Sequence, residues 1–175
     1  MNPTLKYGII GGLSLSMLLF AGYSMEWYKV SFKYGWTILE MLILIFSLYF
    51  GVKESRRIKY QGEIRYKNAL LEGFKILLII TLFHSISIYA YFASNEEKFK
   101  AYKAYTSQSA IMAMEKAEYP ETDIDKFREL VKTEFTPYTL AKDNILYDLL
   151  LGLIVVLIIA SILRKRDPAP VHGAG

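Results

Sequence analysis

Cysteine is absent from the 175 residues of this chain. Its absence excludes disulfide bonds, a thiol nucleophile, cysteine-ligated zinc and lipid attachment through a cysteine side chain. Histidine is scarce, because only His84 and His172 occur, so one chain is not expected to hold a haem between two histidines. The sequence also lacks a P-loop, a G-x-S-x-G elbow and an H-E-x-x-H motif. We therefore expect no catalytic site, no cofactor and no metal.

Long polar stretches are few, because 53% of the residues are hydrophobic and many of them fall in four long blocks. These blocks are residues 7–25, 34–52, 69–93 and 144–163. A helix of about 20 apolar residues crosses the roughly 30 Å hydrocarbon layer, whereas a lone strand cannot satisfy its backbone there. The blocks predict an all-α fold, with a bundle of four membrane-spanning helices in a single membrane domain over residues 1–175.

The first block has an alternative interpretation as a cleaved signal peptide. Its apolar run is longer than the roughly 7–15 residues of such peptides, and no A-x-A site follows it cleanly. The charged start that precedes it is thin, with Lys6 alone. We expect the helix to be retained, and its removal would leave the later helices in the same orientation.

The chain has a net charge of +4, and its basic residues lie at the ends of the apolar blocks. This position favours contact with a membrane surface over nucleic-acid binding. Four spans place two basic segments on the same side. These are Lys53, Arg56, Arg57, Lys59, Arg65 and Lys67 after the second block, and Arg164, Lys165 and Arg166 after the fourth. Positive residues near span ends face the cytoplasm. We expect them to act as topology anchors, with both termini cytoplasmic and residues 164–175 forming a disordered basic tail.

The stretch IFSLYFGVKESRRIKYQGEIRYKNALLEGFKILL resembles the region between the second and third spans in the bacterial domain of unknown function 4199 family. The residues that carry the likeness are Phe50, Gly51, Arg56, Arg57, Gly62 and Gly73. The last block, ILYDLLLGLIVVLIIASILRKR, is similar to the ending of that family, with Asp148, Gly152 and Arg164 in the matching places. The resemblance implies a multi-pass protein of the bacterial inner membrane with four spans, and it implies no activity.

The segment 94–143 lies between the last two spans and is expected outside the cytoplasm. Residues 96–119 predict one helix, which Pro120 ends. Thr122 and Asp125 resemble a capping box that opens a second helix, and Pro137 ends that helix. We expect a helical hairpin that rests on the spans.

The second outer helix has a clear apolar face, formed by Ile124, Phe127, Val131 and Phe135. Such a face must be covered, by the first outer helix, by the membrane surface or by a partner protein. About fifty residues without disulfides are marginal for an independent core, so we do not expect a separate domain.

Three ionisable residues fall inside the predicted spans, namely Glu40, His84 and Asp148. Ionisable groups in hydrocarbon are costly and point to function by default. Counted along each helix, all three lie in the outer half of the membrane, where Thr37, Ser85, Ser87 and Asn144 have a similar depth. They predict either a proton-linked or ligand-binding site, in which a carboxylate orients His84, or a hydrogen-bonded clasp between helices.

Two further patterns indicate how the helices are held together. Gly8, Gly12 and Ser16 form a small-xxx-small stripe, which allows close helix packing within the bundle or between copies, and we expect the former. Glu72 and Lys75 are spaced to form a pair that anchors the third span at the membrane surface.

Three functions are compatible with these patterns. The first is a non-enzymatic accessory or scaffold subunit, which requires a membrane-protein partner. The second is a small transporter or channel that uses Glu40 and His84, which requires a homo-oligomer because four spans seldom enclose a wide aqueous path. The third is an enzyme that acts on a lipid-borne substrate. We expect the first, with the lipid bilayer as its environment and no nucleic-acid ligand.

Overall fold

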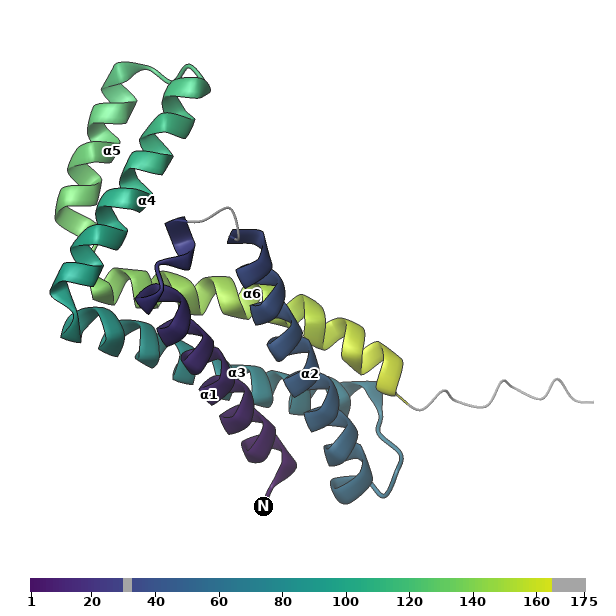
Figure 1. Ribbon diagram of the computed structural model, residues 1–175. Coiled ribbons are helices and arrows are strands. Elements are labelled where there is room, and N and C mark those ends of the chain that lie inside the picture. The colour runs from purple at the N-terminus through teal and green to yellow at the C-terminus, as the bar shows by residue number, and fades with distance from the viewer. Residues whose placement is uncertain (30–32, 165–175) are drawn as a thin grey trace, which may run out of the picture.

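The computed structural model describes residues 1–29 and 33–164, and every regular element within them is a helix. The helices are α1 (Pro3–Ser24), the short 3-10 helix η1 (Trp27–Lys29), α2 (Lys33–Lys59), α3 (Tyr66–Ser94), α4 (Glu96–Lys116), α5 (Glu121–Glu134) and α6 (Pro137–Leu163) (Figure 1). The predicted all-α class is confirmed.

Four of these helices, α1, α2, α3 and α6, are long and apolar enough to cross a membrane. They contain from 22 to 29 residues. At about 1.5 Å per residue this corresponds to about 33–44 Å, which exceeds the roughly 30 Å of the hydrocarbon layer. The prediction of four candidate spans is therefore confirmed, and each span coincides with one of the apolar blocks in the sequence.

All four spanning helices extend beyond their apolar blocks, and α2 and α6 do so by about two turns. The helix α6 begins at Pro137 and not near residue 144, because Thr136 caps it: the Thr139 backbone N–H donates to Thr136 Oγ1 at 3.1 Å. Proline is favoured at the first helical position, where its missing N–H leaves no bond unmade. The helix α2 continues past Val52 to Lys59. Pro137 therefore opens α6, whereas α5 has already ended at Glu134.

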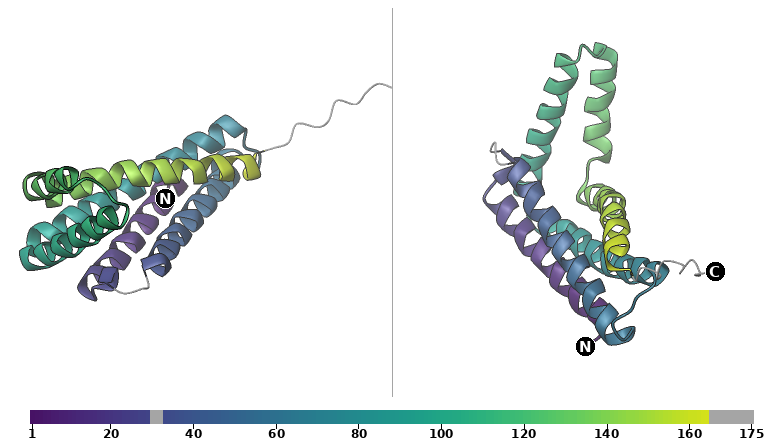
Figure 2. Two further views of the ribbon diagram at one scale, coloured as in Figure 1. Left: turned by 90° about the horizontal axis from the view of Figure 1, so that it is seen from above. Right: turned by 90° about the vertical axis from the view of Figure 1, so that its right-hand side faces the viewer.

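The helix α3 is central and packs against α1, α2 and α6. The helices α1 and α2 lie side by side in one layer, and α3 and α6 form a second layer that crosses the first obliquely (Figures 1 and 2). The most buried apolar residues of the core include Leu48, Ile76, Leu77 and Val156. Large apolar side chains exposed on the outside of the bundle include Phe46, Ile86, Leu150 and Ile158. An apolar exterior around an apolar core is the distribution that a lipid environment favours.

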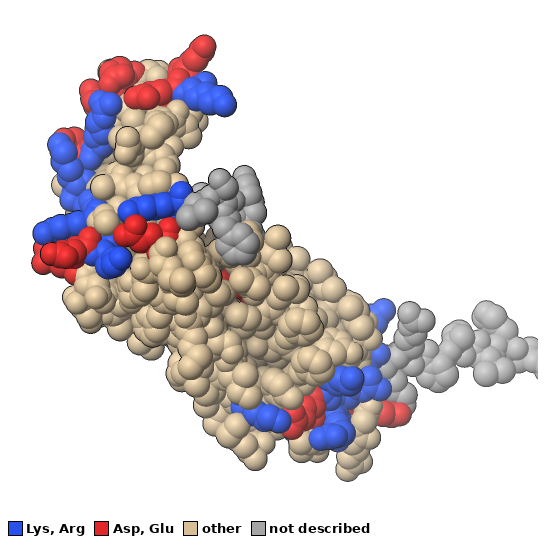
Figure 3. All heavy atoms as spheres, viewed as in Figure 1, with Lys and Arg blue, Asp and Glu red and all other residues tan. Residues whose placement is uncertain are grey.

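Charged side chains gather at the two ends of the molecule, and uncharged residues cover the middle of the face shown in Figure 3. At one end, α1 and α3 begin and α2 and α6 end, and we name this the basic end. The other end carries α4 and α5, and we name it the hairpin end. Both ends of the described chain, near residues 1 and 164, lie at the basic end (Figure 1).

Glycine allows α1 and α3 to pack closely. A Cβ atom added at Gly8 would lie 2.7 Å from Ile79 Cβ, and one at Gly12 would lie 2.6 Å from Phe83 Cβ. One turn later, the Ser16 and Ser87 hydroxyl oxygens are 2.7 Å apart. The small-residue stripe of α1 is therefore occupied by α3 of the same chain, and not by a second copy.

The helices α4 and α5 form an antiparallel hairpin that projects away from the bundle (Figures 1 and 2). Its base is held by aromatic contacts, with ring centroids 5.5 Å apart for Phe92 and Phe99 and 5.9 Å apart for Phe99 and Phe135. Lys103 also donates to the Phe135 carbonyl oxygen at 3.1 Å. The expectation that the hairpin rests on the spans is wrong, because only its base contacts them.

The hairpin also corrects the expected start of its second helix. No side chain caps α5, which begins at Glu121 directly after Pro120, so Thr122 and Asp125 do not form a capping box there. Ile124 and Val131 are buried, and α4 is the helix against which α5 packs. Of the three covers expected for the apolar face of α5, the structure provides the first outer helix.

Candidate functional site

His84 and Asp148 meet between α3 and α6 near the hairpin end. The distance from His84 Nδ1 to Asp148 Oδ2 is 2.9 Å, and the side chains are 6% and 18% exposed. Asn144, one turn before Asp148 on α6, donates its side-chain N–H to the same Asp148 oxygen at 2.9 Å. The structure thus brings together two of the three ionisable residues that the sequence singled out, and adds Asn144.

The hydrogen-bond pattern of this group indicates the tautomer of His84. A carboxylate only accepts hydrogen bonds, so His84 must carry a proton on Nδ1 to bond to Asp148. The Asn144 nitrogen is also 3.1 Å from His84 Nδ1, but two donors cannot share a bond. The Asn144 amide therefore bonds to Asp148, and in this neutral tautomer Nε2 of His84 is the ring nitrogen that can accept a hydrogen bond.

Glu40 lies on α2, across a small cavity from His84 and Asp148. The cavity has a volume of about 30 Å³, and its walls come from α1, α2, α3 and α6. This is room for about two water molecules at roughly 15 Å³ each. The Trp36 indole N–H, one turn earlier on α2, donates to the Glu40 carboxylate. Glu40 thus shares a cavity with the other two ionisable residues, and its bond within the described structure is to Trp36.

A second, wider cleft lies directly outside this cavity. It has a volume of about 200 Å³ and is lined by Tyr23, Trp27, Tyr28, Trp36, Thr37, Glu40, Tyr102 and Asn144. Thr37 and Glu40 line both the cleft and the small cavity, so they form the boundary between the two. The Tyr28 hydroxyl is buried without a hydrogen-bond partner within the described residues, and burial raises the pKa of Tyr28. Glu40 and Thr37 therefore place polar groups between the aromatic cleft and the mainly apolar cavity that His84 lines.

The remaining polar residues expected at this depth are placed elsewhere. Ser87 bonds to Ser16 and so joins α3 to α1. The Ser85 hydroxyl is buried and makes no hydrogen bond within residues 1–29 and 33–164. Among all the residues that the structure describes, no group of three or more His, Asp or Glu side chains is arranged so that it could hold a metal ion.

Glu72 forms the centre of a second polar network at the basic end. Its side chain is 3% exposed, and one oxygen accepts from Lys59 Nζ at 2.6 Å and from Thr4 Oγ1 at 2.5 Å. The expected partner Lys75 is more distant, at 3.4 Å, and is half exposed. This carboxylate therefore joins the start of α1, the end of α2 and the start of α3. Only the pair of Glu72 and Lys75 could be recognised in the sequence, by its spacing on one helix, because Thr4 and Lys59 come from other helices.

The expected topology anchors have different environments. Arg56 is held by two backbone carbonyl oxygens, with Nε donating to Gly62 at 2.5 Å and a terminal nitrogen donating to Leu163 at 3.3 Å. Arg164 lies over the Tyr66 ring, 6.0 Å from its centroid. The side chains of Lys53, Arg57, Arg65 and Lys67 are exposed. Lys165, Arg166 and the rest of the expected disordered tail lie outside the described residues.

Comparison with known protein families places this chain in a family. A protein family described as "Protein of unknown function (DUF4199)" matches residues 6–165, which include all four candidate spans and the hairpin. No curated protein and no solved structure matches the chain. Because the match covers most of the sequence, this protein belongs to the DUF4199 family.

Proposed function

We propose that this protein is a non-enzymatic accessory subunit of a complex in the bacterial inner membrane, and that its projecting hairpin binds the extracytoplasmic part of a membrane-protein partner. The observation that carries this proposal is the shape of the hairpin. The helix α4 has 21 residues, about 31 Å at 1.5 Å per residue, and only its base is packed against the bundle. A long helical pair that its own bundle leaves uncovered is suited to contact with a second protein.

The surface of the hairpin supports a protein partner. Tyr105 packs on Tyr28 with 5.4 Å between ring centroids, and this contact marks how far the described residues outside the hairpin cover α4. Met112 lies two turns beyond it on α4, and Tyr119 follows at the tip. Met112 is 52% exposed and Tyr119 is 54% exposed. We name Met112 and Tyr119 the distal patch. Charged residues of both signs gather on the hairpin in Figure 3, and three exposed ones lie between Met112 and Tyr119 in the chain, namely Glu115, Lys116 and Glu118. An apolar centre with a polar rim is typical of protein interfaces.

Native purification in mild detergent tests this function. We expect a stoichiometric membrane-protein partner to co-purify with the tagged protein, and the M112D/Y119D variant to lose it while the variant remains folded. Leu130→Asp is the matched control, because Leu130 is equally exposed but lies on α5 outside the distal patch. A pure homo-oligomer, or equal loss of the partner in the control, would contradict the proposal.

A second candidate function is a small oligomeric transporter or channel, and the two adjoining cavities near the hairpin end favour it. The aromatic cleft leads to Glu40, and the small cavity behind Glu40 reaches His84. Transport would require that Glu40→Gln abolishes flux in proteoliposomes while the protein keeps its thermal stability. A clasp between helices would instead lose stability without a specific transport defect.

A further inference from the structure

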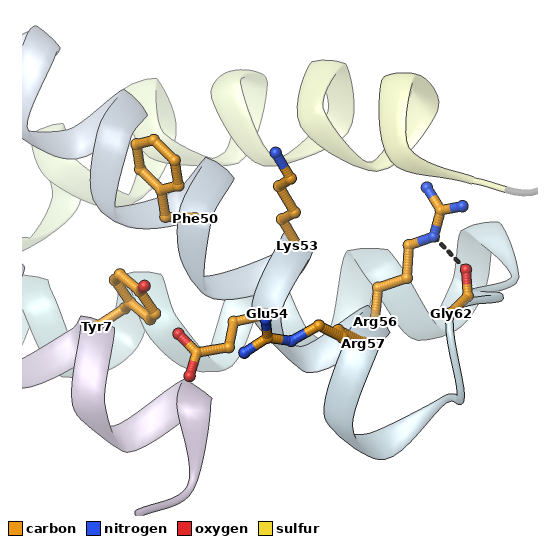
Figure 4. Close-up of a pocket in the computed structure, with 7 residues that line it drawn as sticks. All are labelled: Tyr7, Phe50, Lys53, Glu54, Arg56, Arg57 and Gly62. Atoms are coloured by element: carbon orange, nitrogen blue, oxygen red, sulfur yellow. Dashed lines mark hydrogen bonds between the residues drawn. The ribbon is translucent and has the colours of Figure 1, made fainter.

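An open cleft of about 440 Å³ lies at the basic end, between the start of α1 and the end of α2 (Figure 4). It is lined by Tyr7, Phe50, Lys53, Glu54, Arg56, Arg57 and Gly62. Its volume falls within the roughly 300–1,000 Å³ of small-ligand sites. It does not adjoin the cavity of Glu40 and His84, with which it shares no lining residue.

The charge of the cleft is positive. Lys53 and Arg57 are one turn apart on α2, and both line the cleft, with Arg57 on the side of Glu54 in Figure 4. Neither forms an ion pair within the described residues, in which the salt bridge of Glu54 is to Lys6, at 2.9 Å. Glu54 pairs with Lys6, and the nearby charge of Arg57 also attracts this carboxylate. One carboxylate thus faces three cations, Lys6, Lys53 and Arg57, and the cleft keeps an excess of positive charge.

Arg56 gives the cleft a fixed wall. Its two hydrogen bonds to the Gly62 and Leu163 carbonyl oxygens hold the guanidinium group against the loop after α2, as Figure 4 shows for Gly62. The side chain of Arg56 is therefore committed to the fold. Lys53 and Arg57 are the side chains that are available to an anion.

The opposite wall of the cleft is apolar and leads toward the middle of the bundle. Phe50 is 43% exposed, and its ring stacks on that of Phe46 with 6.2 Å between centroids. Phe46 is 55% exposed and lies one turn before Phe50 on α2, on the side away from the basic end. An apolar surface therefore begins inside the cleft and continues along the outside of a spanning helix.

We propose that this cleft binds the phosphate group of an anionic phospholipid, with Lys53 and Arg57 contacting the phosphate and an acyl chain lying along Phe50 and Phe46. Arginine and lysine both bind phosphate through charge-assisted hydrogen bonds. Basic pockets at the ends of spanning helices are suited to anionic headgroups. A soluble phosphate compound offers the same charge, but it would leave Phe50 and Phe46 unused.

Lipid binding to the purified, detergent-solubilised protein tests the proposal. We would titrate phosphatidylglycerol and phosphatidylcholine and follow bound lipid by native mass spectrometry and thermal unfolding. Phosphatidylglycerol should bind more tightly, and K53Q/R57Q should weaken its binding by about thirty-fold, at about 1 kcal/mol per basic residue and 1.4 kcal/mol per tenfold. R65Q/K67Q is the matched control, because these exposed basic residues of the same connector lie outside the cleft.

Each outcome distinguishes the proposal from its alternatives. Equal affinity for the two lipids, or equal losses in both double variants, would show general attraction to basic charge and overturn a specific site. Glycerol 3-phosphate that stabilises the protein as well as phosphatidylglycerol would assign the cleft to a soluble phosphate and overturn the lipid. Phe50→Ala separates these sources, because it should weaken binding of the lipid and leave glycerol 3-phosphate unaffected.

Discussion

His84 on α3 and Asp148 on α6 contact each other 2.9 Å apart, and the pair joins two helices whose residues are 64 positions apart in the chain. Removal of the carboxylate would leave a buried imidazole without its acceptor. We expect Asp148→Ala to lower the free energy of unfolding by about 1–3 kcal/mol, the cost of an unsatisfied buried polar group. Thermal unfolding in detergent measures this change. Asp143→Ala, at an exposed site on the same helix, should be neutral, and equal losses would argue against the pair.

The network at Glu72 predicts unequal roles for two lysines. Lys59 donates to Glu72 at 2.6 Å and is 28% exposed on its side chain, whereas Lys75 is 3.4 Å away and 49% exposed. We expect Lys59→Gln to lower the free energy of unfolding by about 1–3 kcal/mol and Lys75→Gln by under about 1 kcal/mol, the usual value of an exposed pair. Both variants are measured in the same thermal unfolding assay, and Lys75→Gln serves as the control for Lys59→Gln. A larger loss for Lys75 would contradict the geometry.

The spans could be predicted from the sequence because lipid imposes one simple requirement, a long apolar helix, and this chain meets it in four separate blocks. The helix limits were less predictable. Apolar composition locates the hydrocarbon layer, but the start of α6 is set by the cap at Thr136 and by Pro137, which lie outside that layer. The direction of the hairpin depends on aromatic packing at Phe99 and Phe135, which no local pattern specifies.

The candidate site was predictable only in depth. Counting residues along each helix gives Glu40, His84 and Asp148 a similar height, and the structure places all three around one cavity. The identity of the bonded pair depends on how α3 packs against α6, which a single sequence does not reveal. The network at Glu72 was missed for the same reason, because Thr4 and Lys59 reach it from two other helices.

Gly12 tests the close packing of α1 against α3. A Cβ atom there would lie 2.6 Å from Phe83 Cβ, and neither atom can rotate away. We expect Gly12→Ala to lower the free energy of unfolding by about 1–3 kcal/mol, the cost of an overpacked core, although alanine favours helices more than glycine. Thermal unfolding is again the measurement. An unchanged or raised melting temperature would show that α1 and α3 are packed more loosely than described.

Acid should loosen the attachment of η1 to α4. Glu26 pairs with Lys29 at 2.6 Å and with Lys98 at 3.4 Å, and the hydrogen bond from Lys29, together with that from Lys98, holds the pKa of Glu26 below its usual value. A lowered pKa in the folded state means that the pair stabilises the protein above the ordinary carboxyl pKa. That contribution is lost as the pH falls through the lowered pKa.

Hydrogen exchange at the start of α4 would report this change. Acidification slows the intrinsic exchange of amides, so the rates must first be corrected for this effect. After the correction, the backbone amides after Lys98 should be less protected from exchange in acid than at neutral pH. Glu26→Gln should show the faster exchange already at neutral pH, with little further change in acid. Glu97→Gln is the control, since Glu97 is exposed nearby and forms no ion pair within the described residues. A pH response that persists in Glu26→Gln would assign it to another group.

The absence of cysteine makes the orientation of the protein directly measurable, because any introduced thiol is the only one in the chain. The basic segments predict that the basic end faces the cytoplasm and the hairpin end faces outward. In spheroplasts, Ser109→Cys on α4 should react with a membrane-impermeant maleimide, which reaches only the extracytoplasmic side. Gln61→Cys, in the exposed loop between α2 and α3, should react only after the membrane is permeabilised. The reverse pattern would place the hairpin in the cytoplasm, and with it the partner proposed for the distal patch.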